Sequence, residues 1–402
     1  MLPPISPNRD QRPPSSPALF ALGFRPFFTL AGPFAVLAIL AWAVIYAYAP
    51  AWTPGGLPAM LWHGHEMVYG FAQAAIAGFL LTAITNWTGI NTIRGPALAT
   101  LAALWLSARL GYLLPSSSAL TLSAAADLAF GIGLLAAVGA PVIQVRQWRQ
   151  LGLLAKVALM PVANAIYYAG VLGHLPQGTY WGLYAGLYLV LAVLFTVARR
   201  IVPFFIERGV PERFTPRNRR WIDIASLALF SAWAILDIFT RQSQLVAWLS
   251  IGLAIVHAWR LLDWHTPGIW RRPLLWSLYV GYGFLVLGFL LKALSTWAGL
   301  SSSLAVHAFA VGGIGLMTIG MMTRVTVAHT GRNPLDPPRI LAPIFALILL
   351  AALLRVVVPI FLPAHYQLWI AVSQALWIAG FAAFSFIFLP MLARPRIDGR
   401  PG

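Results

Sequence analysis

The 402-residue chain consists almost entirely of apolar stretches of about twenty residues, which follow one another with short turns between them. A stretch of about 20 apolar residues is long enough to cross the hydrocarbon core of a bilayer as a helix. Twelve such stretches can be marked, at 27–49, 62–86, 96–114, 119–144, 151–172, 179–202, 221–240, 243–262, 273–298, 302–328, 340–362 and 366–392. The sequence therefore predicts an all-α polytopic membrane helix bundle with about 12 transmembrane helices.

The composition excludes a water-soluble fold of this length. Hydrophobic residues make up 60% of the chain and charged residues only 9%, whereas about 25% of the residues in a soluble domain are charged. We expect a single transmembrane domain, 27–392, between two cytoplasmic tails at 1–26 and 393–402. The first tail is proline-rich and is predicted to be disordered. The first helix itself is expected to direct insertion into the membrane.

The arginines predict the orientation of the chain. The formal net charge is +17, and only Lys156 and Lys292 are lysines. The arginines gather in every second loop, including a basic loop at about 203–220, while the opposite loops hold only Arg241. Because cytoplasmic loops carry the excess of Lys and Arg, both termini are predicted to be cytoplasmic. The charge thus follows from topology and from contact with anionic lipid headgroups, and no nucleic-acid partner is expected.

Residues 62–96 resemble residues 304–338 at a fixed offset of 242 positions. The matches fall mainly at His, Gly and Pro, such as His65 with His307, rather than at the Leu and Ala that are common in any membrane helix. The pattern predicts an internal repeat in which helices 1–3 and 9–11 are duplicated units of the same topology. The alternative is chance similarity between apolar helices.

Three histidines are candidate metal ligands. Ionisable side chains inside a membrane span are costly and are functional candidates by default. The predicted topology places His63, His65 and His307 together in the outer half of the membrane. Imidazole is the commonest metal ligand and binds both iron and copper, so histidines at one depth predict a metal site. The alternative is that each histidine hydrogen-bonds a neighbouring helix.

The spacing of the histidines limits how they share a metal. His63 and His65 are about 200° apart on a regular helix. They bind one metal only if the helix begins between them, and otherwise they have different partners. The repeat pairs His65 with His307, which suits axial ligation of a haem, or a haem on one and copper near the other. Because the chain has no cysteine, covalent haem attachment and thiolate metal ligands are excluded.

Arg109 and Arg355 lie at a similar depth to the histidines. Arginine pairs with carboxylates through two parallel hydrogen bonds, so both residues are candidates to bind haem propionates. The alternative is that they pack helices together through ion pairs, with Asp127 and Asp237 as partners.

Three other ionisable residues each allow two interpretations. Glu66 is placed to deliver protons or to orient a metal ligand, and alternatively it is a solvated carboxylate at the membrane interface. His257 and His329 lie near the inner face. We expect them either to bind lipid headgroups or to be ligands of a second metal centre.

Several motifs resemble those of the NnrS family of polytopic membrane proteins. They include Leu22-Gly23-Phe24-Arg25-Pro26-Phe27-Phe28, Trp62-His63-Gly64-His65-Glu66-Met67, and the stretch from His307 through Met322-Thr323-Arg324 to His329-Thr330-Gly331-Arg332. The resemblance covers almost the whole chain. It implies twelve helices, haem b and copper as cofactors, a role in nitric oxide metabolism and nitrosative-stress defence, and a place in the bacterial inner (cytoplasmic) membrane.

The resemblance also implies particular ligands. His63, His65 and His307 match the family's motifs and are the leading ligands by this comparison. Tyr279 stands where relatives often carry His. Either the family's ligand is missing at that position or Tyr279 replaces it.

The leading hypothesis for function is a haem–copper membrane protein that binds or reduces nitric oxide, an apolar gas that enters lipid. As an oxidoreductase it would use Glu66 to supply protons and a quinol or an external donor to supply electrons. A second hypothesis is a non-catalytic protein that holds nitric oxide, copper or haem. A third is a twelve-helix secondary transporter whose coupling ions use Asp127 or Asp237. Metal content separates the third hypothesis from the first two, and turnover separates the first from the second.

Overall fold

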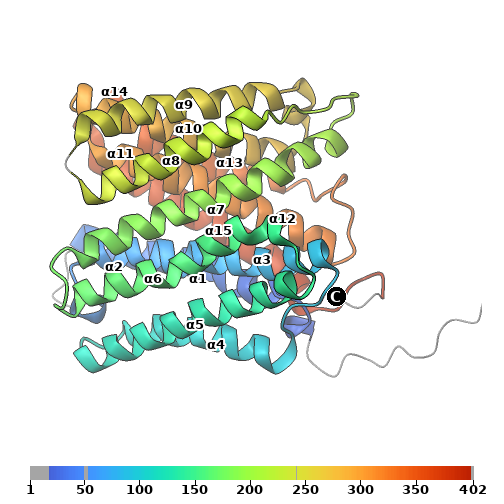
Figure 1. Cartoon of the computed structure of the whole chain (residues 1–402), viewed down its shortest axis with the longest axis horizontal. Coiled ribbons are helices and arrows are strands. Elements are labelled where there is room, and N and C mark those ends of the chain that lie inside the picture. Colours follow the sequence, from blue (N-terminus) through green and yellow to red (C-terminus); the bar gives the residue numbers. More distant parts are fainter. Residues whose placement is uncertain (1–17, 49–52, 241, 400–402) are drawn as a thin grey trace, which may run out of the picture.

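Long helices that run nearly parallel make up the molecule (Figure 1). The computed structural model describes residues 18–48, 53–240 and 242–399, and these residues contain no strand. Nine rods are continuous helices: α1 (Phe24–Tyr48), α4 (Gly95–Gly111), α5 (Ser117–Gln144), α6 (Leu151–Val171), α7 (Gly178–Gly209), α8 (Arg220–Phe239), α9 (Ser243–Trp264), α10 (Pro273–Trp297) and α15 (Tyr366–Ala393). The predicted all-α bundle is confirmed.

Three further rods are each interrupted by a π-helical segment. The first consists of α2 (Ala59–His65) and α3 (Gln73–Thr88) on either side of Glu66–Ala72. The second consists of α11 (Ser302–His307) and α12 (Leu316–His329) on either side of Ala308–Gly315. The third consists of α13 (Leu341–Ala352) and α14 (Val358–Phe361) on either side of Leu353–Val357. π-Helical turns in α-helices often occur at functional sites.

The lengths of the rods fit membrane spans. Within the described residues, eleven rods are at least 18 residues long and apolar enough to cross a bilayer. The twelfth rod, α4, has 17 residues. It rises about 26 Å at 1.5 Å per residue, slightly less than the ~30 Å of a hydrocarbon core. The number of rods therefore agrees with the twelve spans expected from the sequence.

The two ends of the described chain lie at the same end of the bundle (Figure 1). Arg25, at the start of α1, donates hydrogen bonds of 2.7 Å to the carbonyl oxygens of Leu392 and Arg394, at the end of α15. An even number of crossings explains this arrangement, whereas the cytoplasmic location of that end stays a prediction. Residues 1–17, most of the predicted tail, and Arg241 lie outside the described residues. A short helix at Ala18–Phe20 already precedes α1.

Helix α7 is longer than expected from the sequence. We expected the span to end at residue 202 and a basic loop to follow over about 203–220. Instead the helix continues through Pro203 to Gly209, and only residues 210–219 link it to α8. The extension keeps an apolar face, on which Ile206 is fully buried. Packing therefore continues the helix after its sequence has become too polar to count as a membrane span.

The rods α2–α3 and α11–α12 form the centre of the bundle. Their apolar windows are 89% and 72% buried in the described structure, the highest shares among the eleven spans. Both rods change from α- to π-helix directly after a histidine, His65 in one and His307 in the other. These histidines are the pair related by the offset of 242 positions. The repeat itself remains a prediction, with which this matching change of backbone agrees.

Candidate functional site

Helix α2 presents its two histidines to different neighbours. His63 and His65 lie in one regular helical turn, so their side chains diverge by about 200°. The His63 ring stacks on Trp42 of α1, with the ring centroids 4.5 Å apart. The His65 ring instead stacks on Tyr167 of α6 at 4.4 Å. The two histidines therefore belong to different clusters of polar side chains. The sequence allowed either a shared metal or different partners for them, and the structure shows different partners.

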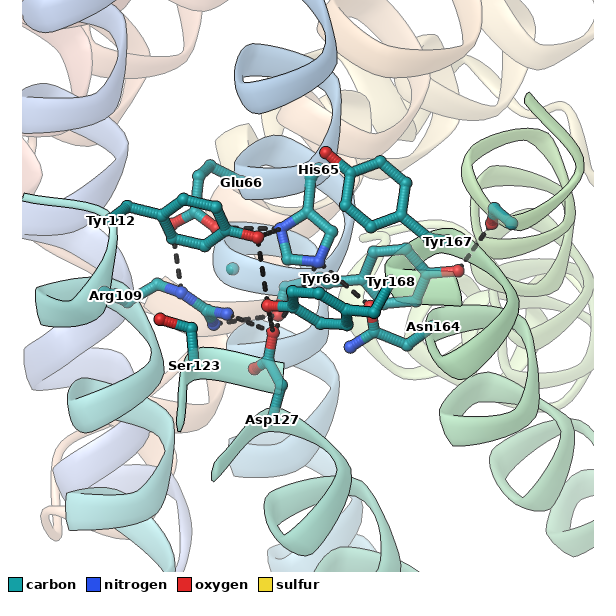
Figure 2. A network of polar contacts seen from close by, with 12 residues as sticks. His65, Glu66, Tyr69, Arg109, Tyr112, Ser123, Asp127, Asn164, Tyr167 and Tyr168 are labelled. Atoms are coloured by element: carbon teal, nitrogen blue, oxygen red, sulfur yellow. Dashed lines mark hydrogen bonds and ion pairs between the residues drawn. The ribbon is translucent and has the colours of Figure 1, made fainter. Parts of the chain in front are cut away.

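The first cluster surrounds the fully buried His65 (Figure 2). Its Nδ1 lies 2.9 Å from Glu66 Oε1 and 3.2 Å from the Tyr112 hydroxyl. Its Nε2 lies 2.9 Å from Asn164 Oδ1 and 3.6 Å from Asp127 Oδ2. Both ring nitrogens of His65 thus have protein partners.

Arg109 joins the two carboxylates of this cluster. Its Nη2 donates to Asp127 Oδ2 at 2.5 Å, and its Nε lies 2.9 Å from Glu66 Oε2. All three side chains are almost completely buried, and Glu66 is only 2% exposed. Charges removed from water need close partners of opposite sign. Arg109 is therefore an ion-pair partner within the protein, and the interpretation of Glu66 as a solvated interfacial carboxylate is wrong.

Two tyrosines complete a continuous chain of polar contacts. The Tyr112 hydroxyl donates to the Tyr168 hydroxyl, and the Tyr168 hydroxyl donates to Asp127 Oδ2, each at 2.9 Å. Because Tyr112 and Glu66 both contact Nδ1 of His65, the chain runs from Glu66 by way of that one nitrogen and the two hydroxyls to Asp127 (Figure 2). Such an arrangement of donors and acceptors can pass a proton along its length.

The second cluster contains His63 and His307. Each of them interacts electrostatically with Arg355, and they interact with one another. The buried Nδ1 of His63 has no hydrogen-bond partner within the described residues. His307 Nδ1 donates to the carbonyl oxygen of Ser303 at 2.7 Å. Since a carbonyl only accepts, Nδ1 carries the proton and Nε2 keeps its lone pair.

Arg355 holds this cluster together from the third interrupted rod. Its Nη2 donates to Ser303 Oγ at 3.1 Å, and Ser303 Oγ lies 3.2 Å from His307 Nδ1. Its Nη1 donates to the Tyr366 hydroxyl at 3.2 Å. No carboxylate in the described part of the chain pairs with Arg355. Asp237, the partner considered from the sequence, pairs with Lys292 at 2.7 Å instead.

The second cluster fits a metal better than the first. A metal-bound imidazole commonly donates its other N–H to a carbonyl oxygen, and this is the arrangement of His307. His63 offers a buried nitrogen without a partner. His65, by contrast, uses both nitrogens within the first cluster. No group of three or more His, Asp or Glu side chains that could hold a metal ion is found among the described residues.

Both clusters lie inside a region that matches a known protein family. The sequence profile of the family described as NnrS protein matches residues 18–396. The chain belongs to the NnrS family. The resemblance seen in the motifs is thereby confirmed over nearly the whole length of this NnrS-family bundle. No curated protein is similar enough to match the chain.

Two other candidates of this NnrS-family chain lie outside both clusters. His257 is fully buried, with its Nδ1 2.6 Å from the Tyr282 hydroxyl and its ring stacked on Phe195 at 4.2 Å. It therefore does not bind lipid headgroups. Tyr279 donates from its hydroxyl to the carbonyl oxygen of Leu261 at 3.1 Å, a contact between neighbouring helices.

Sequence reasoning missed several members of the two clusters. Asn164, Tyr167 and Tyr168 were not singled out, although their i, i+3 and i+4 spacing places them on one face of α6. A polar stripe of this kind on a membrane helix is a signal that could have been used. Ser303 gave no such signal, because it is the last of three consecutive serines at a helix start, where serine usually serves as a cap.

Proposed function

We propose that this NnrS-family protein holds haem b and copper in the half of the bundle away from the arginine-rich end, and that it binds or reduces nitric oxide there. The observation that carries the proposal is the pair His63 and His307, two imidazoles on neighbouring rods. The buried Nδ1 of His63 has no hydrogen-bond partner in the described structure, and His307 donates from Nδ1 to Ser303, which leaves its Nε2 for a ligand. Iron and copper both accept imidazole. Nitric oxide is small and apolar, so it reaches such a site directly from lipid.

The residues of the second cluster would have distinct tasks. His307 is the leading haem ligand, because Ser303 fixes its tautomer and ring orientation. His63 is the leading copper ligand or the ligand on the other haem face. Arg355, which has no carboxylate within the described residues, is placed to pair with a haem propionate. His65 and Arg109, which the sequence also favoured for cofactor binding, fit better as members of the buried polar chain.

The first cluster would supply protons. Reduction of two nitric oxide molecules to nitrous oxide and water consumes two electrons and two protons. When bound, the metals supply the redox chemistry. Glu66 directly follows the helical turn that carries His63, and its chain of contacts through His65 can deliver a proton to that side of the bundle. A quinol or an external donor would supply the electrons.

Metal analysis of the purified protein tests the proposal. Protein produced with ample haem and copper should show a Soret band and bound copper. The His307→Ala variant should lose most of the haem, and His63→Ala should lose copper or change the haem spectrum. His174→Ala and His365→Ala are matched controls, because both histidines are exposed in the segments that link rods at the same end. An unchanged spectrum and copper content in the His63→Ala/His307→Ala double variant would exclude a centre at this place.

A second candidate function is secondary transport. It is favoured by buried ion pairs in separate parts of the bundle, Arg109 with Asp127 and Lys292 with Asp237. The two candidates separate cleanly in one preparation. A colourless, copper-free protein whose ion binding depends on Asp127 would favour transport, whereas anaerobic consumption of nitric oxide by the reduced protein would favour catalysis.

A further inference from the structure

Arg324 is a partly buried cation that has no anionic partner in the described structure. It lies on α12, and its guanidinium sits over the Phe205 ring of α7 at 3.7 Å from the ring centroid. It makes no hydrogen bond or ion pair with any described residue. The aromatic face attracts the cation weakly, but it leaves the guanidinium hydrogen-bond donors unused. A cation held in this way retains its charge for a ligand.

A small hollow opens beside Arg324 at the arginine-rich end of the bundle. It is lined by the last residue of α7, the first turn of α10, Arg324 itself and three residues of the loop after α12, Pro334, Leu335 and Pro337. Arg272 is the second arginine of this lining. Its Nη1 donates a hydrogen bond of 2.9 Å to the carbonyl oxygen of Leu335. None of these lining residues is acidic, and Asp336, between Leu335 and Pro337, is not part of the lining.

The start of α10 adds to the positive potential of the hollow. Arg272 occupies the N-cap position, Pro273 begins the helix without an N–H group, and no side chain caps the first turn. The N–H groups of Leu275 and Trp276 donate to the carbonyl oxygen of Arg272. Leu274 therefore carries the one N–H group of this turn for which the described structure gives no partner. The N-terminus of a long helix carries a partial positive charge, and its free N–H groups bind phosphate and similar anions. Two arginines and a helix N-terminus thus meet in one hollow.

We propose that this hollow binds a phosphate group, either the headgroup phosphate of an anionic lipid or free phosphate. Guanidinium groups match the oxygens of phosphate in geometry and charge. Basic pockets between membrane helices are typical sites for anionic headgroups. The proposal does not rest on the proposed metal centre, whose residues His63 and His307 lie at the opposite end of the rods.

Native mass spectrometry of the detergent-purified full chain tests this site with defined phospholipids. The wild type should retain phosphatidylglycerol in preference to phosphatidylcholine. Arg324→Gln and Arg272→Gln should each weaken this retention about fivefold to tenfold. Arg339→Gln is the matched control, because Arg339 is an exposed arginine of the same loop region outside the hollow. If Arg339→Gln weakens retention as much as Arg324→Gln, the effect is general surface charge and the proposal is wrong.

A second arm separates the two sources of phosphate. Delipidated protein is titrated with inorganic phosphate, and its thermal stability is followed. Stabilisation that disappears in Arg324→Gln identifies free phosphate, whereas loss of lipid retention without a phosphate effect identifies the lipid. Arg324→Lys keeps the charge and serves if Arg324→Gln does not fold, with partial retention expected. Absence of both lipid preference and phosphate stabilisation in the wild type overturns the proposal.

Discussion

Two kinds of buried or half-buried cation occur within the rods of this bundle. Arg109, Arg260 and Lys292 each contact a carboxylate at 2.5–2.9 Å. Arg324 and Arg355 contact no carboxylate in the described structure. The first kind fixes helices relative to one another, since removing a partner leaves an uncompensated charge in a medium of low dielectric constant. The second kind keeps its charge available, and both of its members lie beside a candidate ligand site.

The Arg109–Asp127 pair gives a prediction of stability. Arg109→Leu should lower the free energy of unfolding by about 3–5 kcal/mol, because it leaves two buried carboxylates without their cation. Asp127→Asn should cost less, because Arg109 keeps its contact with Glu66. The double variant should lose less than the sum of the two. Unfolding in mixed micelles measures all three. Arg199→Gln is the control, since its side chain is 53% exposed in its pair with Asp223 and should cost less than about 1 kcal/mol. Strict additivity of the two single effects would contradict the coupling.

Arg355 gives a prediction about haem. Arg355→Gln should lower the haem content of the purified protein several-fold and leave copper unchanged, because it removes the charge that would face a propionate. It also removes a contact with Ser303, so Ser303→Ala separates the two effects. Lys292→Gln is the control, because Lys292 is also a partly buried cation but pairs with Asp237. Equal haem loss in Lys292→Gln would show that the effect is one of folding.

At the scale of elements, much of the architecture could be predicted and the neighbours of each histidine could not. Hydropathy located twelve rods, because burial in lipid requires long apolar stretches whatever the packing. The 200° divergence of His63 and His65 followed from helix geometry alone. The choice of His63, and not His65, as the neighbour of His307 depends on how α2 is rotated against α1 and α6. Packing sets that rotation, and an offset between repeats relates equivalent positions without making them neighbours.

Close approach of the central rods gives a prediction at the same scale. A Cβ at Gly312, in the π-helical segment before α12, would overlap the ring of Phe284 on α10. Gly312→Ala should therefore destabilise the protein by about 1–3 kcal/mol through overpacking. Gly139→Ala in α5 is the matched control, because a Cβ there meets no atom within 4 Å and alanine favours the helix. Equal melting temperatures of the two variants would contradict this prediction, because they would show that α10 and the rod α11–α12 can move apart without loss of stability.

For the whole molecule, the testable feature is orientation. The described chain starts and finishes at one end of the bundle, and we predict that this end faces the cytoplasm. The absence of cysteine makes each introduced cysteine unique. His174→Cys should react with a membrane-impermeant maleimide added to intact cells with a permeable outer envelope. Asp336→Cys should react only after the inner membrane is opened. The reverse pattern would falsify the predicted orientation.

Helix α2 has only seven residues, yet it carries one imidazole into each polar cluster. Its short length and the π-helical segment that follows it have a mechanical consequence. The two rings are attached to the same rigid turn, so the helix cannot rotate about its axis and move one ring while the other stays in place. If a ligand that binds to His63 moves its ring, the contacts of His65 must therefore change as well. The two clusters share no side chain, but they are connected rigidly through the backbone between His63 and His65.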